Sequence, residues 1–134
     1  MTQMQDPNEI WRASLSEAPR RIEEQPPVFL RVEAWPYPEL DRVWVRLETS
    51  PFDAFPNLEL LLTDPDGELV GEMFMVEMRE AYQSLTLHLR QPPRPGERYR
   101  LTLELTRDEQ PLDTRELDVD LVFRDPKETK RESE

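Results

Sequence analysis

Seven segments of this sequence alternate apolar and polar residues with a period of two, and no helical pattern separates them. Successive side chains of a β-strand point to opposite faces, so this period indicates strands that bury one face and expose the other. A half-buried sheet needs a second layer against it, so the pattern predicts an all-β fold of two packed sheets. The predicted strands cover residues 28–35, 43–48, 58–63, 68–76, 85–90, 99–105 and 117–123.

Proline and glycine mark the turns between these segments. In Asp64-Pro65-Asp66-Gly67 the proline presets the second turn position and the glycine supplies a positive φ, which predicts a tight turn between paired strands. The strand after this turn is apolar on both faces, and we expect a β-bulge at Gly71 to reverse its alternation. Another turn is predicted at residues 108–111, before the last strand.

The number, order and spacing of the strands over residues 28–123 resemble those of immunoglobulin-like and fibronectin type III-like sandwiches. The resemblance implies a seven-stranded antiparallel sandwich, and a small closed barrel is the structural alternative. It implies no particular function, because such folds carry many unrelated functions. Two features of antibody domains are missing. The chain has no cysteine pair, and Trp44 does not match their core tryptophan, because it is out of phase with Val43 and Val45.

Two terminal parts flank the sandwich sequence. Residues 1–27 predict a short helix and an extended connector, because Asp6 and Pro7 form a helix start and an apolar stripe follows. A helix of about three turns is unstable alone, so its stripe must dock on its own domain or on a partner. Residues 124–134 are charged and predict a disordered tail. The stripe consists of Ile10, Trp11, Leu15 and Ala18.

Composition and charge exclude several kinds of protein. The absence of cysteine excludes disulfide frameworks, zinc–thiolate sites and thiol nucleophiles. The net charge of −12 repels phosphate backbones and anionic lipids, so we expect neither nucleic acid nor membrane as a partner, whereas a basic protein would be attracted. A basic, apolar leader and a membrane-spanning segment are both lacking, so we expect a cytoplasmic location. We expect no cofactor.

His88 is the only histidine of the chain, so a two-histidine metal site is excluded. The alternation turns His88 outward beside Thr86 and Arg90, and the local sequence places no serine as a nucleophile. We therefore interpret His88 as a surface residue and predict no catalytic residues. An enzyme would require a cleft that gathers its imidazole with at least two carboxylates.

Three acidic residues of the last predicted strand share one face. Calcium could relieve their repulsion through oxygen ligands, but calcium sites usually take carboxylates from a curved loop. Arg100 on a neighbouring strand could neutralise the row equally well, and we favour that solvated ion-pair interpretation. No metal site is predicted. The row consists of Glu116, Asp118 and Asp120.

Several aromatic residues fall outside the apolar faces of their strands. Phe29, Trp44 and Phe74 alternate out of phase with their apolar neighbours, and Trp35 and Tyr37 lie at a strand end. Exposed rings can stack on sugars or anchor a protein interface. The competing interpretation is that the stripe of the N-terminal helix covers these rings, because large apolar patches are rarely left in water.

Methionines form a second candidate surface. Met73, Met75 and Met78 lie near Phe74 on the strand with two apolar faces. Methionine adapts to partners of variable shape, although it more often fills gaps in a core. An apolar strand at a sheet edge can also pair with a second copy, so homodimerisation through this strand is a hypothesis.

The sequence therefore favours a small, non-catalytic protein-interaction module with an immunoglobulin-like sandwich and a short N-terminal helix. The alternative is a carbohydrate-binding module that uses Trp35, Tyr37 and Trp44, which requires uncovered rings. An enzyme that uses His88 is the third hypothesis. The candidate interaction surface comprises Trp11, Leu15, Trp35, Tyr37, Trp44, Met73, Phe74 and Met75.

Overall fold

The computed structural model describes residues 25–126, and the predicted N-terminal helix and most of the predicted tail lie outside them. Residues 25–125 contain no helix. Among residues 25–126, none forms a helix long and apolar enough to cross a membrane. The prediction of seven strands is confirmed: β1 (Phe29–Pro36), β2 (Arg42–Thr49), β3 (Asn57–Thr63), β4 (Leu69–Met75), β5 (Tyr82–His88), β6 (Arg98–Arg107) and β7 (Gln110–Asp120).

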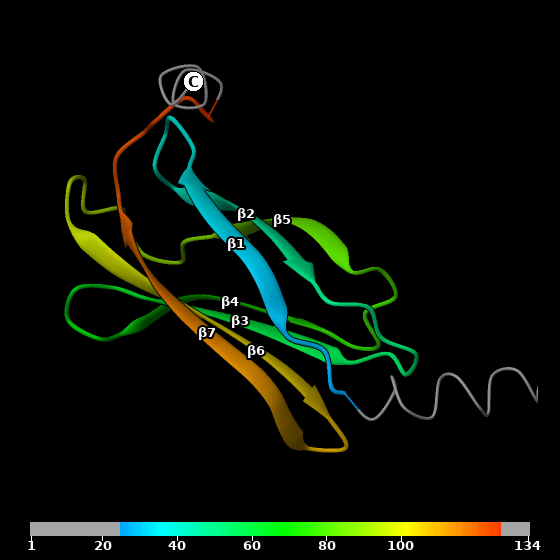
Figure 1. Cartoon of the computed structure of the whole chain (residues 1–134). Coiled ribbons are helices and arrows are strands. Elements are labelled where there is room, and N and C mark those ends of the chain that lie inside the picture. The colour runs from blue at the N-terminus through cyan, green and yellow to red at the C-terminus, as the bar shows by residue number, and fades with distance from the viewer. Residues whose placement is uncertain (1–24, 127–134) are drawn as a thin grey trace, which may run out of the picture.

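The strands form two antiparallel sheets, as the alternation predicted. One sheet has the strand order β1-β2-β5, and the other has the order β4-β3-β6-β7. Figure 1 shows the three-stranded sheet lying over the four-stranded sheet, with the chain passing between them after β2, β4 and β5. Strand pairing within the described residues stays inside each sheet, so the fold is a sandwich and not a closed barrel.

The core lies between the sheets and is built mainly from leucine and valine. Paired leucines of β3 and β6 are fully buried, and they face a row of apolar residues on β2. Burying one such side chain stabilises the fold by about 1.5–3 kcal/mol. The central members of this core are Val43, Val45, Leu47, Leu58, Leu60, Leu62, Leu101, Leu103 and Leu105.

Strand β1 corrects the predicted orientation of its first residues. The alternation placed Val28 and Leu30 inside and Phe29 outside, but Phe29 is 3% exposed and Leu30 is 57% exposed. The pairing of β1 with β2 shifts between Phe29 and Arg31, so Leu30 is an extra residue that reverses the phase. From Val32 onward the predicted alternation is restored.

Strand β4 contains the predicted bulge. Leu62 pairs with Gly71 and Thr63 pairs with Leu69, which leaves Val70 as the extra residue, one position before the expected glycine. The carbonyl of Val70 accepts a hydrogen bond from the backbone N–H of Arg90 at 2.7 Å, and this bond joins the two sheets beyond the end of β5.

The hairpin turns between β3 and β4 and between β6 and β7 follow different chemistry. The predicted turn before β4 is confirmed, because Gly67 has φ 87° and its N–H donates to the carbonyl of Asp64 at 2.9 Å. Between β6 and β7, Asp108 and Glu109 have φ of 53° and 65°, which makes a two-residue hairpin turn without glycine.

Strand β7 begins at Gln110, seven residues before the predicted start. The alternation did not predict its first half, because the charged residues Asp113 and Arg115 occupy inward positions opposite leucines of β6. These side chains reach the edge of the other sheet: Asp113 Oδ2 accepts from the N–H of Phe29 at 2.8 Å, and Arg115 Nη2 donates to the carbonyl of Phe29 at 2.6 Å.

Candidate functional site

The outer face of the three-stranded sheet gathers three of the aromatic residues that the sequence singled out. Trp35 of β1 and Trp44 of β2 are direct cross-strand partners, and Tyr37 follows β1 at the same end of the sheet. All three side chains are half-buried. We call this surface the Arg–aromatic face; it consists of Arg31, Glu33, Trp35, Tyr37, Arg42, Trp44, Arg46 and Tyr82.

Contacts with β5 fix the orientation of Trp44. Its indole Nε1 donates to Ser84 Oγ at 2.8 Å, and Cζ of Arg46 lies 5.1 Å from the centroid of its ring. Arg46 Nε also donates to the hydroxyl of Tyr82 at 3.0 Å. A guanidinium over an aromatic ring is an attractive cation–π arrangement, so these three side chains hold one another.

Tyr37 is held in the same way at the end of the sheet. Its hydroxyl lies 3.1 Å from Thr86 Oγ1, and Cζ of Arg42 lies 4.5 Å from its ring centroid. The hairpin between β1 and β2 positions Tyr37, whose N–H donates to the carbonyl of Arg42 at 3.0 Å. Leu40 in this hairpin has φ 63°, a left-handed conformation that a leucine adopts only at a cost.

Glu33 connects Arg31 and Arg46 to Trp35. It accepts hydrogen bonds from Trp35 Nε1 and Arg31 Nε, each at 3.2 Å, and Arg46 Nη1 lies 3.7 Å from its Oε1. Burial alone would raise the pKa of Glu33, but the hydrogen bonds from Trp35 and Arg31 and the nearby arginine charges outweigh it and lower the pKa. Glu33 is therefore ionised at neutral pH and anchors the face.

The arrangement is chemically suited to binding. Tryptophan, tyrosine and arginine are the residues most enriched where protein interfaces concentrate their binding energy. The indole N–H groups of Trp35 and Trp44 are already bonded within the face, so a partner need not satisfy them. The guanidinium of Arg31, whose side chain is 62% exposed, can still bind a carboxylate or carbonyl of a partner.

The structure divides the second candidate surface. Met73 and Met75 are half-buried against the core, and Met78 is fully buried, so these methionines do not form an exposed patch with Phe74. Phe74 alone projects outward on the opposite face of β4, which is an edge strand. Trp11 and Leu15, the remaining candidates, lie outside the described residues.

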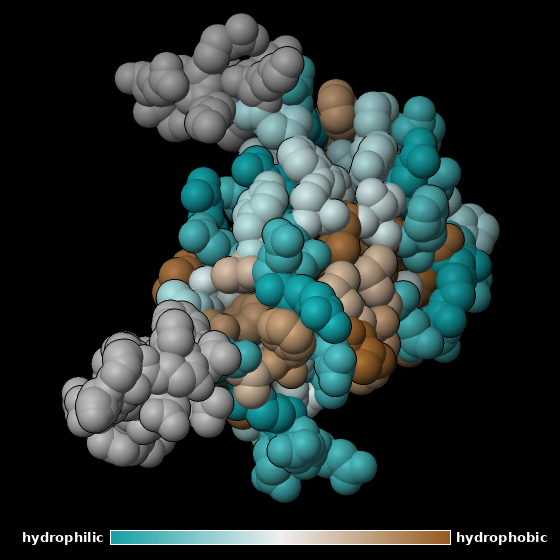
Figure 2. Space-filling view, turned by 90° about the vertical axis from the view of Figure 1, so that its right-hand side faces the viewer, coloured by the Kyte–Doolittle hydropathy of each residue, from teal (hydrophilic) through white to brown (hydrophobic). Residues whose placement is uncertain are grey.

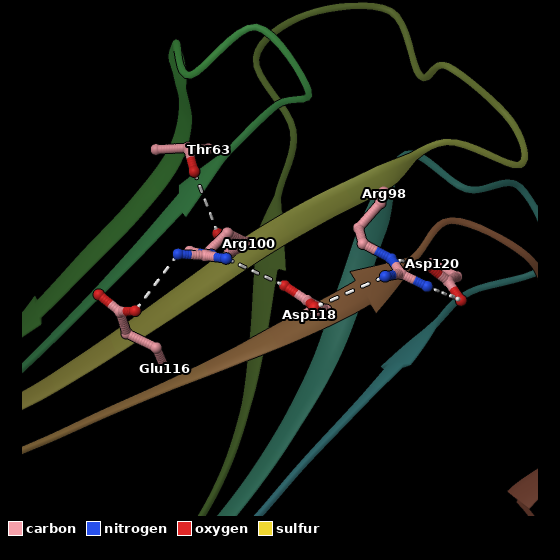
Figure 3. A network of polar contacts seen from close by, with 6 residues as sticks. All are labelled: Thr63, Arg98, Arg100, Glu116, Asp118 and Asp120. Carbon is pink, nitrogen blue, oxygen red and sulfur yellow. Dashed lines mark hydrogen bonds and ion pairs between the residues drawn. The ribbon is translucent and has the colours of Figure 1, made fainter.

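The acidic row of β7 is neutralised by arginines, as predicted (Figure 3). Arg100 Nη1 lies 3.4 Å from Glu116 and its Nη2 lies 3.5 Å from Asp118. Arg98 pairs with Asp120 at 2.8 Å, and this hydrogen bond lowers the pKa of Asp120. Over residues 25–126, no three histidine, cysteine or acidic residues gather where they could hold a metal ion.

His88 ends β5 on the exposed surface, opposite Arg42 of β2. Within the described part of the chain, its ring has neither a hydrogen bond nor an ion pair. The prediction that His88 is a surface residue is confirmed.

Sequence reasoning missed five of the eight residues of the Arg–aromatic face. It identified Trp35, Tyr37 and Trp44, and the residues it missed are Arg31, Glu33, Arg42, Arg46 and Tyr82. Arg42 and Arg46 could have been found, because they alternate with Val43 and Val45 on β2 just as Trp44 does. Tyr82 could not, because its place beside Arg46 depends on how β5 pairs with β2.

Comparisons with known proteins bear on the fold. No family model matches the sequence, and no curated protein matches it. The structure is similar to part of a glycosyl hydrolase family 2 member from Bacteroides cellulosilyticus DSM 14838, with 16% sequence identity and a TM-score of 0.55. It is also similar to part of a β-glucuronidase from Ruminococcus gnavus in complex with C6-substituted uronic isofagomine, with 17% identity and a TM-score of 0.53.

These similarities cover 72% and 71% of this chain but only 15% and 16% of the two glycosidase chains. The chain therefore spans a small part of the length of each protein that it resembles. At such low identity the likeness shows the fold alone, which is that of an all-β sandwich.

Proposed function

We propose that this chain is a non-catalytic binding domain of the immunoglobulin-like class and that its Arg–aromatic face binds a protein. Strand order supports the class. In constant-type immunoglobulin domains, the first, second, fifth and fourth strands share a sheet. Here β1, β2 and β5 share a sheet in the same way, whereas β4 pairs with β3 in the other sheet.

The observation that carries the proposal is the concentration of tryptophan, tyrosine and arginine on one outer sheet face. The core is complete without these side chains, since its buried members come from the inner faces of both sheets. They remain half-exposed and mutually oriented, so they would lose little side-chain entropy on binding. Such preorganised aromatic anchors are typical of binding surfaces and are not needed for packing.

Charge indicates the kind of partner for each face. The outer face of the four-stranded sheet carries Glu59, Glu72, Glu104 and the row of β7 against Arg98 and Arg100. It therefore stays acidic and would attract the basic partner that the net charge predicts. The Arg–aromatic face carries three arginines and one glutamate. It therefore suits a protein that presents carboxylates around an apolar centre.

A capture experiment with matched variants tests the proposal. Tagged full-length chain would capture its partner, and the purified partner would then be titrated with wild type, Trp44→Ala and Phe74→Ala. We expect Trp44→Ala to weaken binding at least about 30-fold, corresponding to an interface anchor of about 2 kcal/mol. Phe74→Ala, on the other sheet, should bind like wild type. Equal affinities for all three proteins would refute the proposal.

Carbohydrate binding is the second candidate, because both similar structures belong to glycosidases and the three aromatic rings share one face. Guanidinium groups lie over the rings of Tyr37 and Trp44, so a sugar would have to displace them or stack elsewhere. Arg46→Ala uncovers the ring of Trp44 and distinguishes between the two candidate functions. It should strengthen binding of cello-oligosaccharides or glucuronides if sugars are the ligands, and weaken binding if a protein is the ligand, both measured by calorimetric titration.

A further inference from the structure

A hollow of about 230 Å³ opens at the end of the sandwich where the described chain begins. Figure 2 shows this end of the molecule, on which apolar side chains gather between polar ones. Gln25 and Pro27 form one wall, and the connection between β2 and β3 forms another. The lining residues of that connection and of β6 are Pro51, Phe52, Asp53, Ala54 and Arg107.

Phe52 lines the hollow, and further apolar side chains lie at the same end of the sandwich. Phe52 packs edge-on against Phe55 with 6.4 Å between the ring centroids, and Phe55 remains 39% exposed. Val28 is 40% exposed and is joined to the same connection, because the N–H of Ser50 donates to its carbonyl at 2.9 Å. This end of the sandwich therefore offers an apolar seat for a large side chain.

Two arginines at this end have no carboxylate partner among residues 25–126. Cζ of Arg79 lies 4.7 Å from the ring centroid of Phe55. Arg107 Nη2 donates to the carbonyl of Ala54 at 2.6 Å, whereas its buried Nε has no acceptor within the described residues. A buried N–H without an acceptor costs about as much as a lost hydrogen bond. Asp53 also lines the hollow, and against this one carboxylate the two arginines leave one positive charge in excess, so the seat suits an occupant that combines apolar and acidic groups.

We propose that residues 6–18 of the same chain dock in this hollow, with the stripe that contains Trp11 against Phe52 and Phe55. The segment has the required chemistry. Its stripe is apolar, and it carries Asp6, Glu9 and Glu17 against the single basic residue Arg12. Those carboxylates are complementary to Arg79 and Arg107.

The length of the connector favours this seat over the Arg–aromatic face. Six residues separate Ala18 from Gln25, which itself lines the hollow, and the seven steps from Ala18 to Gln25 span at most about 25 Å when fully extended. From Phe29 to Trp35, strand β1 leads about 20 Å away from the end of the sandwich that holds the hollow. Covering Trp35 would therefore require a stretched connector that turns back along β1, whereas docking in the hollow requires neither. The inference is independent of the proposed function.

The absence of cysteine allows a specific test with the full-length chain. Ser16→Cys places a spin label on the face of the predicted helix opposite the stripe. Paramagnetic broadening of backbone amide signals then reports which residues lie near the label. We expect the strongest broadening at residues 52–54 and 107, with at least a twofold loss of intensity relative to the reduced label. Trp11→Ala in the labelled chain should abolish this broadening, and a label at Ser133→Cys should not reproduce it.

Two other outcomes would overturn the proposal. Broadening centred on Trp35 and Trp44, or broadening no stronger at the hollow than elsewhere, would show that the segment does not dock there. Broadening that persists when unlabelled ¹⁵N chains are mixed with spin-labelled ¹⁴N chains would show docking on a second copy. Phe55→Ser leaves the core intact. It should weaken the broadening at least twofold, while the other amide signals keep the positions of the folded protein.

Discussion

Glu33 accepts hydrogen bonds from Trp35 and Arg31 and lies beside Arg46, so one carboxylate organises three members of the Arg–aromatic face. Its neighbours lower its pKa from the ordinary value of 4.5 in the folded state. A carboxylate with a lowered folded-state pKa contributes stability above its unfolded pKa, and this contribution is lost as the pH falls through the folded-state value.

Replacing Glu33 with glutamine tests this linkage. At pH 7 the variant should be less stable than wild type by up to about 1 kcal/mol, the range of partly exposed ion pairs. The difference should begin to shrink near pH 4.5, the ordinary value, and should disappear below the folded-state pKa. Denaturant titrations at a series of pH values measure it. Glu48→Gln, on the same sheet face but without an ion pair in the described structure, is the control, and a pH-independent difference would contradict the assignment.

The sequence predicts on which face of its sheet a side chain lies only where no bulge intervenes. Trp44 and Phe74 project outward as predicted, because their strands keep a period of two through these positions. Phe29 was placed on the wrong face, because Leu30 is an extra residue and reverses the alternation before it. This bulge arises from the pairing of β1 with β2 and, unlike the bulge of β4, leaves no mark in the local pattern.

At the scale of elements, the hairpin between β6 and β7 is strained by its residues. Asp108 and Glu109 both have positive φ, a conformation that costs residues with a β-carbon about 1 kcal/mol or more. Asp-Gly is a preferred pair for this two-residue turn. We therefore expect Glu109→Gly to stabilise the domain by about 0.5 kcal/mol, after allowing for the greater freedom of glycine in the unfolded chain.

Chemical denaturation would show this gain as a higher midpoint with an unchanged slope. Glu109→Ala is the matched control, because it removes the same carboxylate but retains the β-carbon, and it should give no such gain. Equal stabilisation by both variants would attribute the effect to charge and would reject the explanation by backbone conformation.

The strands themselves were predictable from the sequence, but the contacts between residues of different strands were not. Alternation identified all seven strands, and Asp64 to Gly67 identified the turn before β4. The early start of β7 was missed because Asp113 and Arg115 interrupt its apolar positions for the sake of contacts with Phe29. Tyr82 of the Arg–aromatic face was missed for a related reason: its contacts with Arg46 join residues of β2 and β5 that are far apart in sequence.

At the scale of the molecule, the two sheets meet along both sides, and Gly71 belongs to one of these junctions. A β-carbon built at Gly71 would lie 3.0 Å from the backbone oxygen of His88. That oxygen belongs to the main chain of β5 and cannot move without shifting the sheet. Because Gly71 does not have a positive φ, any penalty of substitution arises from this close approach.

Gly71→Ala should therefore destabilise the domain by about 1–3 kcal/mol, the usual cost of inserting a methyl group into a packed site. Thermal and denaturant unfolding of the full chain measure it. Gly71→Ser should lose at least as much. A variant with alanine at this position and wild-type stability would mean that the sheets are not held as closely as the structure shows.

The opposite junction has a consequence for how the chain is made. The backbone of Phe29 is bound by Asp113 and Arg115, which lie 84 and 86 positions later in the sequence. During synthesis the first strand therefore waits, with its outer edge unsatisfied, until nearly all of the domain has left the ribosome. Folding is then a late event that the final hairpin completes, and chains released before β7 would present β1 as an open edge to their neighbours.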